Sequence, residues 1–129
     1  MHLVHLVIGL ALVQYVWFGI LVGRARGLYK VSAPAITGNE VFERQFRVQQ
    51  NTLELLVILV PSLLMFAYYV DPRWAAAIGA LYLVGRFVYA ATYVKDPKKR
   101  SVGFTLSMLP VLALLIGGLV GAVRGLIAG

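Results

Sequence analysis

Two helical stripes of polar residues are the part of this sequence that could do chemistry. Arg47, Asn51 and Glu54 are spaced i, i+4 and i+7, which places them on one face of a helix. A second stripe, spaced i, i+4, i+7 and i+11, consists of Tyr82, Arg86, Tyr89 and Tyr93. If the stripes face each other, they form a cavity for a small zwitterionic or multiply anionic ligand, because guanidinium groups pair with carboxylates through parallel hydrogen bonds.

Glu54 and Arg86 stand out because the segments around them are apolar. A charge at the centre of a bilayer costs at least ~2.5–3.5 kcal/mol, so one that persists there usually has a partner or a function. Counted along the expected helices, both residues lie about 10 Å from the same membrane face. Two interpretations remain open: a structural ion pair between Glu54 and Arg86, and a polar ligand site that is entered from the cytoplasm.

The elements that position these residues follow from composition. Hydrophobic residues make up 60 % of the 129 residues and charged residues 13 %, against ~45–50 % and ~25 % in soluble domains. Each apolar run is long enough to cross the ~30 Å hydrocarbon core as a helix. We therefore predict an all-α membrane protein, a four-transmembrane-helix bundle in which residues 1–129 form a single domain. The expected helices cover about 2–23, 47–70, 74–94 and 102–125.

The formal charge of +7 predicts an orientation. Nine of the twelve Lys and Arg residues lie in or beside the first connection, about 24–47, and the third, 95–101. Because basic loops stay in the cytoplasm, we expect these two loops there and both termini outside. This asymmetry explains the charge without nucleic-acid binding, which we do not expect. The Ala-, Val-, Gly- and Leu-rich composition favours a bacterial inner membrane.

Several kinds of site are not expected. The chain has no cysteine, which excludes disulfides and Cys-ligated zinc. His2 and His5 lie near the outer end of the first span and are interpreted as solvated interface residues, so no metal site is predicted. The sequence contains no Ser-His-Asp set and no phosphate-binding loop.

The segment Val41–Glu54, which reads VFERQFRVQQNTLE, resembles the signature of the MAPEG family, the membrane-associated proteins in eicosanoid and glutathione metabolism. Two further segments agree: Val31–Gly38, which contains Ser-Ala-Pro and Thr-Gly, and Arg86–Tyr93 followed by Arg100. The resemblance covers nearly the whole chain. It is strongest to the branch that contains microsomal glutathione transferase 2 and leukotriene C4 synthase.

The resemblance implies a homotrimer in the lipid bilayer, with glutathione as co-substrate bound between neighbouring subunits near the cytosolic side. By matching positions, the residues implied to hold glutathione are Arg26, Arg47, Gln49, Asn51, Glu54, Tyr89 and Tyr93. Glu54 would take the ammonium group and the arginines the carboxylates, while Arg86 would brace Glu54 or the ligand. Arg100 matches the arginine that stabilises the glutathione thiolate, and a neighbouring guanidinium lowers the pKa of a thiol.

The implied activity is transfer of glutathione to a lipophilic electrophile from the bilayer, with glutathione-dependent reduction of lipid hydroperoxides as a further expectation. Leu55 replaces a tyrosine usual in this branch, and Gly27 replaces a second arginine of leukotriene C4 synthase, so a leukotriene substrate is not expected. Two alternatives stay open. One is a non-catalytic lipid-binding scaffold that resembles lipoxygenase-activating protein, and the other is a small proton-coupled exporter that uses Glu54.

Overall fold

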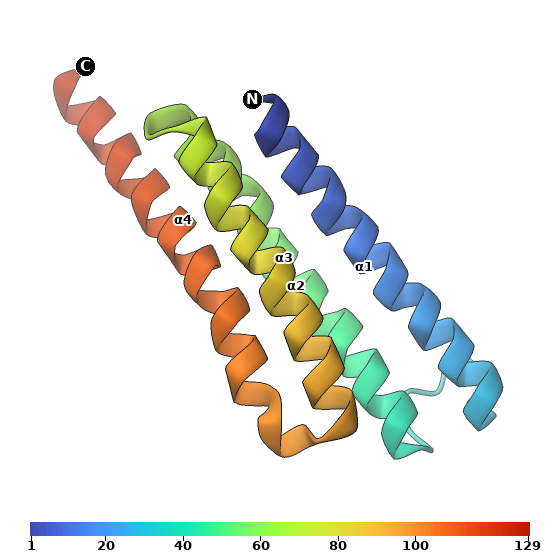
Figure 1. Ribbon diagram of the computed structural model, residues 1–129. Helices are drawn as coiled ribbons and strands as arrows, with labels where there is room; N and C mark the ends of the chain where they lie inside the picture. The colour runs from blue at the N-terminus through green and yellow to red at the C-terminus, as the bar shows by residue number, and fades with distance from the viewer.

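Four long helices make up almost the whole chain, and the computed structural model describes residues 1–129. The helices are α1 His2–Tyr29, α2 Glu40–Tyr69, α3 Pro72–Lys95 and α4 Arg100–Ala128, and a short 3-10 helix, η1, spans Pro97–Lys99. Consecutive helices run antiparallel. Both termini therefore lie at one end of the bundle, and the α1–α2 and α3–α4 connections lie at the other (Figure 1).

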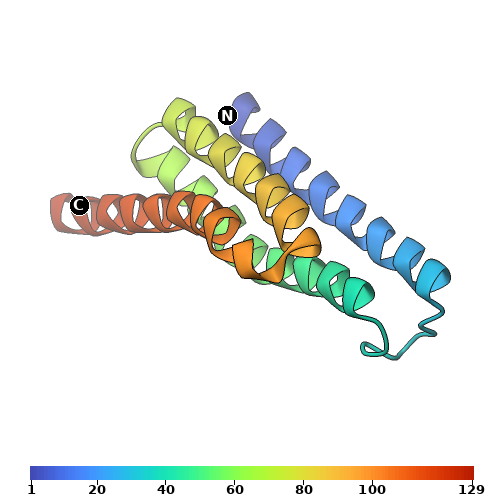
Figure 2. The ribbon, with the colours of Figure 1, turned by 60° about the horizontal axis from the view of Figure 1, so that its bottom comes forward.

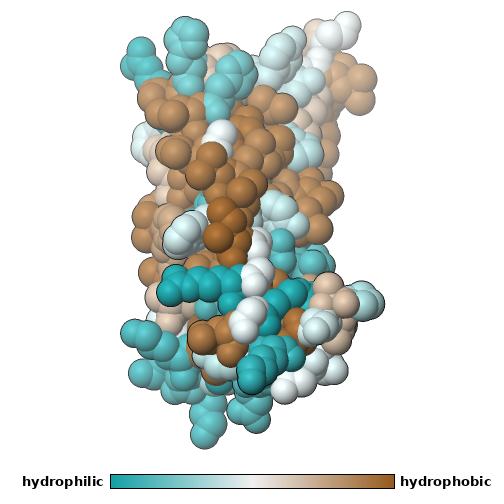
Figure 3. All heavy atoms as spheres, turned by 90° about the vertical axis from the view of Figure 1, so that its right-hand side faces the viewer, coloured by the Kyte–Doolittle hydropathy of each residue, from teal (hydrophilic) through white to brown (hydrophobic).

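The outer surface of the bundle is apolar. All four helices are long and apolar enough to cross a membrane, and a belt of apolar side chains separates the polar ends of the molecule (Figure 3). Leu6, Trp17, Leu81 and Ile116 are each exposed by about half or more of their surface. Such a surface is unfavourable in water and suited to hydrocarbon. The predicted all-α transmembrane bundle is confirmed.

Side-chain caps set where α2 and α3 begin. Asn39 Oδ1 accepts hydrogen bonds from the backbone N–H groups of Val41 and Phe42, at 2.9 and 3.1 Å. Asp71 caps α3 in the same way, and Pro72 occupies the first helical position, where its missing N–H is not needed. The helices reach further than the apolar spans because hydropathy marks only the part that crosses the bilayer. Consequently α1 continues to Tyr29, and α2 begins at Glu40 rather than near residue 47.

The middle pair of helices organises the core. Helices α2 and α3 pack against each other and against both α1 and α4, which lie on opposite sides of the pair (Figure 1). The fully buried side chains at the centre include Val4, Leu59, Leu63, Tyr82 and Leu114. This core fixes the rotation of α2 and α3, and hence the direction in which their polar residues point.

Two glycines bring α3 and α4 into backbone contact at the η1 end. A Cβ atom on Gly85 would lie 2.6 Å from the backbone of Leu106, and one on Gly103 would overlap the backbone of Tyr89. Further along, α4 leaves α3 and packs on α2, where Gly121 faces Tyr69 (Figure 2). The close approach of α3 and α4 is therefore confined to the end of the bundle that carries the candidate site.

Candidate functional site

A cavity of about 390 Å³ opens between α2, α3 and the start of α4. Its lining residues are Arg47, Asn51, Tyr89, Arg100, Ser101, Phe104 and Thr105. We call it the arginine pocket, because two guanidinium groups border it and no carboxylate does. Four of the predicted site residues, Arg47, Asn51, Tyr89 and Arg100, are thus brought together.

Local structure places Arg100 at this pocket. Asp96 caps η1 by accepting a hydrogen bond from the backbone N–H of Lys98 at 3.1 Å, and the tight turn that follows makes Arg100 the first residue of α4. One turn later, Gly103 lets α4 press against the backbone of Tyr89. The pocket therefore receives residues from two helices that a tight turn and a small residue hold together.

The chemistry of the arginine pocket favours an anionic ligand. Arg47 and Arg100 supply ten N–H donors between them, since each guanidinium carries five and no acceptor. The hydroxyls of Ser101 and Thr105 and the phenol of Tyr89 add groups that can donate. A ligand that carries carboxylates matches this donor-rich, positively charged lining.

Arg86 lies behind the pocket and is completely buried, with an exposed fraction of 0 %. Its Nη1 donates to Asn51 Oδ1 at 2.7 Å and to Thr52 Oγ1 at 3.3 Å, and its Nη2 donates to Ser107 Oγ at 2.7 Å. The guanidinium also packs over the ring of Tyr89, 4.4 Å from its centroid. Arg86 therefore connects α2, α3 and α4.

The structure does not form the ion pair between Glu54 and Arg86, which was one of the two interpretations that the sequence left open. All the hydrogen bonds of Arg86 go to neutral oxygens, and the side chain of Glu54 is exposed on the outside of α2. The helix rotation decides this outcome, because Asn51 and Thr52 face α3 while Glu54 does not. Arg86 does not brace Glu54 within one copy of the chain.

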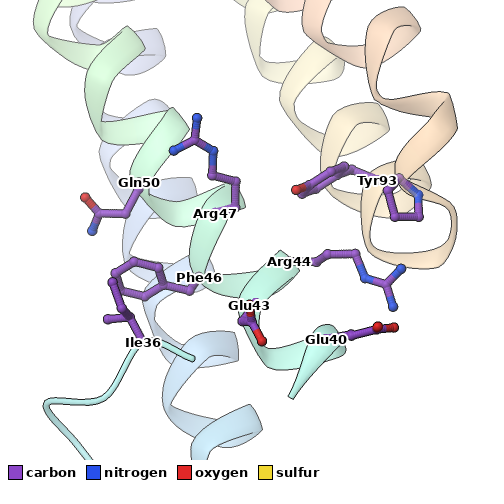
Figure 4. Close-up of a pocket in the computed structure, with 9 residues that line it drawn as sticks. Ile36, Glu40, Glu43, Arg44, Phe46, Arg47, Gln50 and Tyr93 are labelled. Carbon is purple, nitrogen blue, oxygen red and sulfur yellow. The ribbon is translucent and has the colours of Figure 1, made fainter. Parts of the chain in front are cut away.

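A second cavity, of about 550 Å³, lies beside the arginine pocket and shares Arg47 with it. In Figure 4 the ring of Tyr93 points from α3 toward the side of α2 that carries Arg47. The other lining residues are Ile36, Glu40, Glu43, Arg44, Phe46, Gln50 and Pro97. Tyr93 stacks on Tyr89, with ring centroids 5.3 Å apart and planes 8° apart. The stacked tyrosines thus separate the two cavities, and Arg47 borders both.

Arg26 and Gln49 lie elsewhere. Arg26 Nη1 donates to the carbonyl oxygens of Ala35, at 2.7 Å, and Val31, at 3.4 Å, and its guanidinium packs over Phe42. Gln49 lies against α1, where a Cβ on Gly19 would be 2.9 Å from its Nε2 atom. Neither residue lines the arginine pocket. The nine predicted site residues therefore do not form one site within a single copy of the chain.

Four polar residues of the site region were not predicted from the sequence. Thr52 and Ser107 hold Arg86, and Ser101 and Thr105 line the arginine pocket. The signal for the last two is their i, i+4 spacing, which places Ser101 and Thr105 on one face of the helix that begins at Arg100. The structure contains no group of three or more His, Cys, Asp or Glu side chains that could hold a metal ion.

The fold and the site define a class: an integral membrane protein with four helices and a cationic pocket at one end of the bundle. The sequence profile of the MAPEG family matches residues 4–120, and the chain belongs to that family.

Curated relatives are similar over most of the chain. An uncharacterized protein of Synechocystis sp. is 49 % identical over 114 residues, which cover 88 % of this chain and 83 % of that protein. Human microsomal glutathione S-transferase 2 is 44 % identical over 102 residues, which cover 79 % of this chain and 69 % of that protein. Leukotriene C4 synthase of Cavia porcellus is 33 % identical over 84 residues, which cover 65 % of this chain and 56 % of that protein.

Proposed function

We propose that this protein is a membrane-bound glutathione transferase that conjugates glutathione to lipophilic electrophiles. The observation that carries the proposal is the arginine pocket, in which Arg47, Arg100, Asn51 and Tyr89 line one cavity without a carboxylate. The names of its relatives, which include microsomal glutathione S-transferase 2, support the same class of reaction. Glutathione brings two carboxylates, an ammonium group and the reacting thiol.

Arg100 is the proposed catalytic residue. Glutathione loses its thiol proton to solvent, and the guanidinium of Arg100 stabilises the resulting thiolate, which lowers the pKa of the thiol. The thiolate sulfur then forms a bond to an electrophilic carbon, and the leaving group departs with the electron pair of the broken bond. With a lipid hydroperoxide, the thiolate attacks oxygen instead, and a second glutathione completes the reduction to an alcohol, water and glutathione disulfide.

The glutathione site is proposed to be shared between subunits of a homotrimer. Arg26, Gln49 and Glu54 do not line the arginine pocket of their own copy of the chain, and Glu54 is exposed on a membrane-spanning helix. A carboxylate at the centre of a membrane helix costs about 2.5–3.5 kcal/mol. A neighbouring subunit, together with the ammonium group of glutathione, would cover this carboxylate.

The proposed orientation places the glutathione site near the cytoplasmic side of the membrane. The connections 30–39 and 96–99 lie at the same end of the bundle (Figure 1), and nine of the twelve basic residues lie in the wider segments 24–47 and 95–101 that contain them. The positive-inside rule then assigns this end to the cytoplasm and both termini to the outside. A bacterial inner membrane is the proposed location, where the cytoplasm supplies glutathione and the bilayer supplies the electrophile.

Calorimetry and an enzyme assay on the purified protein in detergent test the function. The protein should bind glutathione at millimolar concentration or below, and should accelerate its conjugation to a chlorinated dinitrobenzene, followed by absorbance. Binding without turnover of any electrophile or hydroperoxide would contradict the enzyme. Absence of binding at millimolar glutathione would favour the alternative, a lipid-binding scaffold.

A further inference from the structure

The hydrogen-bond partners of Arg86 are three neutral oxygens, and its Nε atom is buried without a partner. Asn51 and Thr52 of α2 and Ser107 of α4 each accept a hydrogen bond from the guanidinium. Thr52 Oγ1 donates its own proton to the carbonyl oxygen of Val48 at 2.7 Å. Ser107 Oγ lies 2.8 Å from the carbonyl oxygen of Gly103, to which it donates. Both hydroxyl protons are therefore committed to helix carbonyls, and both oxygens are left as acceptors for Arg86.

The same chemistry fixes the orientation of the Asn51 amide. A guanidinium has donors only, so the atom 2.7 Å from Arg86 Nη1 must be the carbonyl oxygen of Asn51 and not its nitrogen. Rotation of the amide by half a turn would bring an N–H group against the guanidinium N–H. Arg86 thus decides which end of Asn51 faces away from it.

The free end of Asn51 belongs to the arginine pocket. Its Nδ2 makes no hydrogen bond within the protein and is not among the buried unpaired atoms, and Asn51 lines the cavity next to Arg47 and Arg100. We propose that Arg86 is a positioning residue that holds the Asn51 amide with its N–H groups available to the pocket, where they donate to an anionic group of the ligand. This inference rests on the proposed function, in which that ligand is glutathione.

The charge of Arg86 also favours an anionic ligand in the arginine pocket. No carboxylate neutralises it within the chain, because all three of its hydrogen-bond partners are uncharged. In a low-dielectric interior such a charge acts over a longer distance than in water. Arg86 therefore polarises the amide it holds and adds a third positive charge behind a pocket that already has two.

Three substitutions separate positioning from simple structural support. Asn51→Asp keeps the size and the acceptor for Arg86, adds an ion pair, and removes the donor from the pocket. Asn51→Leu removes both the acceptor for Arg86 and the donor to the pocket, and it adds no charge. Ser107→Ala is the matched control, because it removes a hydrogen bond of Arg86 at a residue that does not line the pocket. Each purified variant is compared with the wild type by melting temperature and by glutathione calorimetry.

We expect the melting temperature and the affinity for glutathione to change independently of each other in these variants. Asn51→Asp should melt no lower than the wild type and Asn51→Leu should melt lower, yet both should bind glutathione at least about tenfold more weakly. Ser107→Ala should melt lower and keep its affinity within about twofold, since it leaves the donor in place. Wild-type affinity in both Asn51 variants, or a loss in Ser107→Ala as large as theirs, would overturn the inference.

Arg86 itself is tested by a conservative pair. Arg86→Lys retains a charged donor for Asn51 Oδ1, whereas Arg86→Leu leaves the amide free to rotate, so the lysine variant should bind glutathione more tightly. Equal affinities in the two variants would contradict a positioning role. If the wild type itself binds no glutathione, the proposed function fails, and the inference fails with it. If only the variants behave otherwise than expected, the proposed function stands.

Discussion

The guanidinium of Arg86 lies over the ring of Tyr89, 4.4 Å from its centroid. This contact joins the buried charge to the wall of the arginine pocket, because Tyr89 lines the pocket and is almost completely buried itself. Tyr93 continues the stack on the same helix. The ring of Tyr89 therefore has a structural role that its hydroxyl does not share, and substitutions can separate the two.

Tyr89→Phe and Tyr89→Leu should have different effects. The phenylalanine keeps the ring over Arg86, so the melting temperature should stay near that of the wild type, while the KM for glutathione rises several-fold as the hydroxyl is lost. The leucine removes the cation–π contact and should lower stability by about 1–2 kcal/mol. Thermal melts in detergent and steady-state kinetics check both. A phenylalanine variant that is as unstable as the leucine variant would contradict this division.

Arg100→Ala should abolish most of the activity without unfolding the protein. The side chain is exposed at the start of α4, so its loss costs little stability, whereas removal of one group that stabilises developing charge lowers kcat by about 10²–10³-fold. Lys99→Ala is the matched control, since Lys99 is an adjacent exposed cation that does not line the pocket. Stopped-flow measurement of thiolate absorbance should show a higher thiol pKa in Arg100→Ala. Normal turnover would remove Arg100 from the mechanism.

Glu54→Gln tests the proposed role of the carboxylate in binding the ammonium group. The wild type should prefer glutathione to an analogue that lacks the amino group, because an ion pair is lost with the analogue. The variant should bind both weakly and about equally. Proton-driven efflux from proteoliposomes that is lost in Glu54→Gln would instead support the exporter.

Gly103→Ala should weaken both the fold and the site. The added methyl group would overlap the backbone of Tyr89, and overpacking of this kind costs about 1–3 kcal/mol. Gly9→Ala is the control, because a Cβ atom there meets nothing within 4 Å and alanine favours a helix by about 1 kcal/mol. A Gly103→Ala variant with wild-type melting temperature and KM would show that α3 and α4 can separate at no cost.

The absence of cysteine makes the topology directly testable. A single cysteine at Lys98, which is exposed in η1, should react with an impermeant maleimide only after the membrane is opened. A single cysteine at Arg124 should react in intact cells or spheroplasts. The reverse labelling pattern would invert the proposed orientation.

The fold could be predicted from the sequence because the length and apolar character of each run leave a helix across the bilayer as the main solution. The helix ends could not, since they depend on caps such as Asn39 and Asp71 that act outside the apolar spans. Composition carries no information about where a helix ends in water. Local capping chemistry does: Asn39 starts α2 several residues before its apolar span, and Lys30 in the left-handed conformation ends α1.

The grouping of the site was only partly predictable because helical spacing gives relative angles and not the rotation of the helix. Successive residues are about 100° apart, so Glu54 lies about 20° from Arg47 on α2, and Asn51 is turned about 40° the other way. This difference places Asn51 toward Arg86 and leaves Glu54 outside. The hydroxyls of Thr52 and Ser107 accept hydrogen bonds from the terminal nitrogens of Arg86 in its place, and no pattern in the sequence pairs them.

Every residue of the arginine pocket lies in the half of the bundle that carries the two polar connections. The turns of α1–α4 nearer the termini pack mainly through apolar side chains, with Gln14 and Ser62 as buried polar residues, and they hold no candidate site residue. The length and hydropathy of those turns can therefore vary to match a thinner or thicker bilayer, at a modest energetic cost, without displacing the reacting groups. One cationic pocket can in this way be carried unchanged into membranes of different lipid composition.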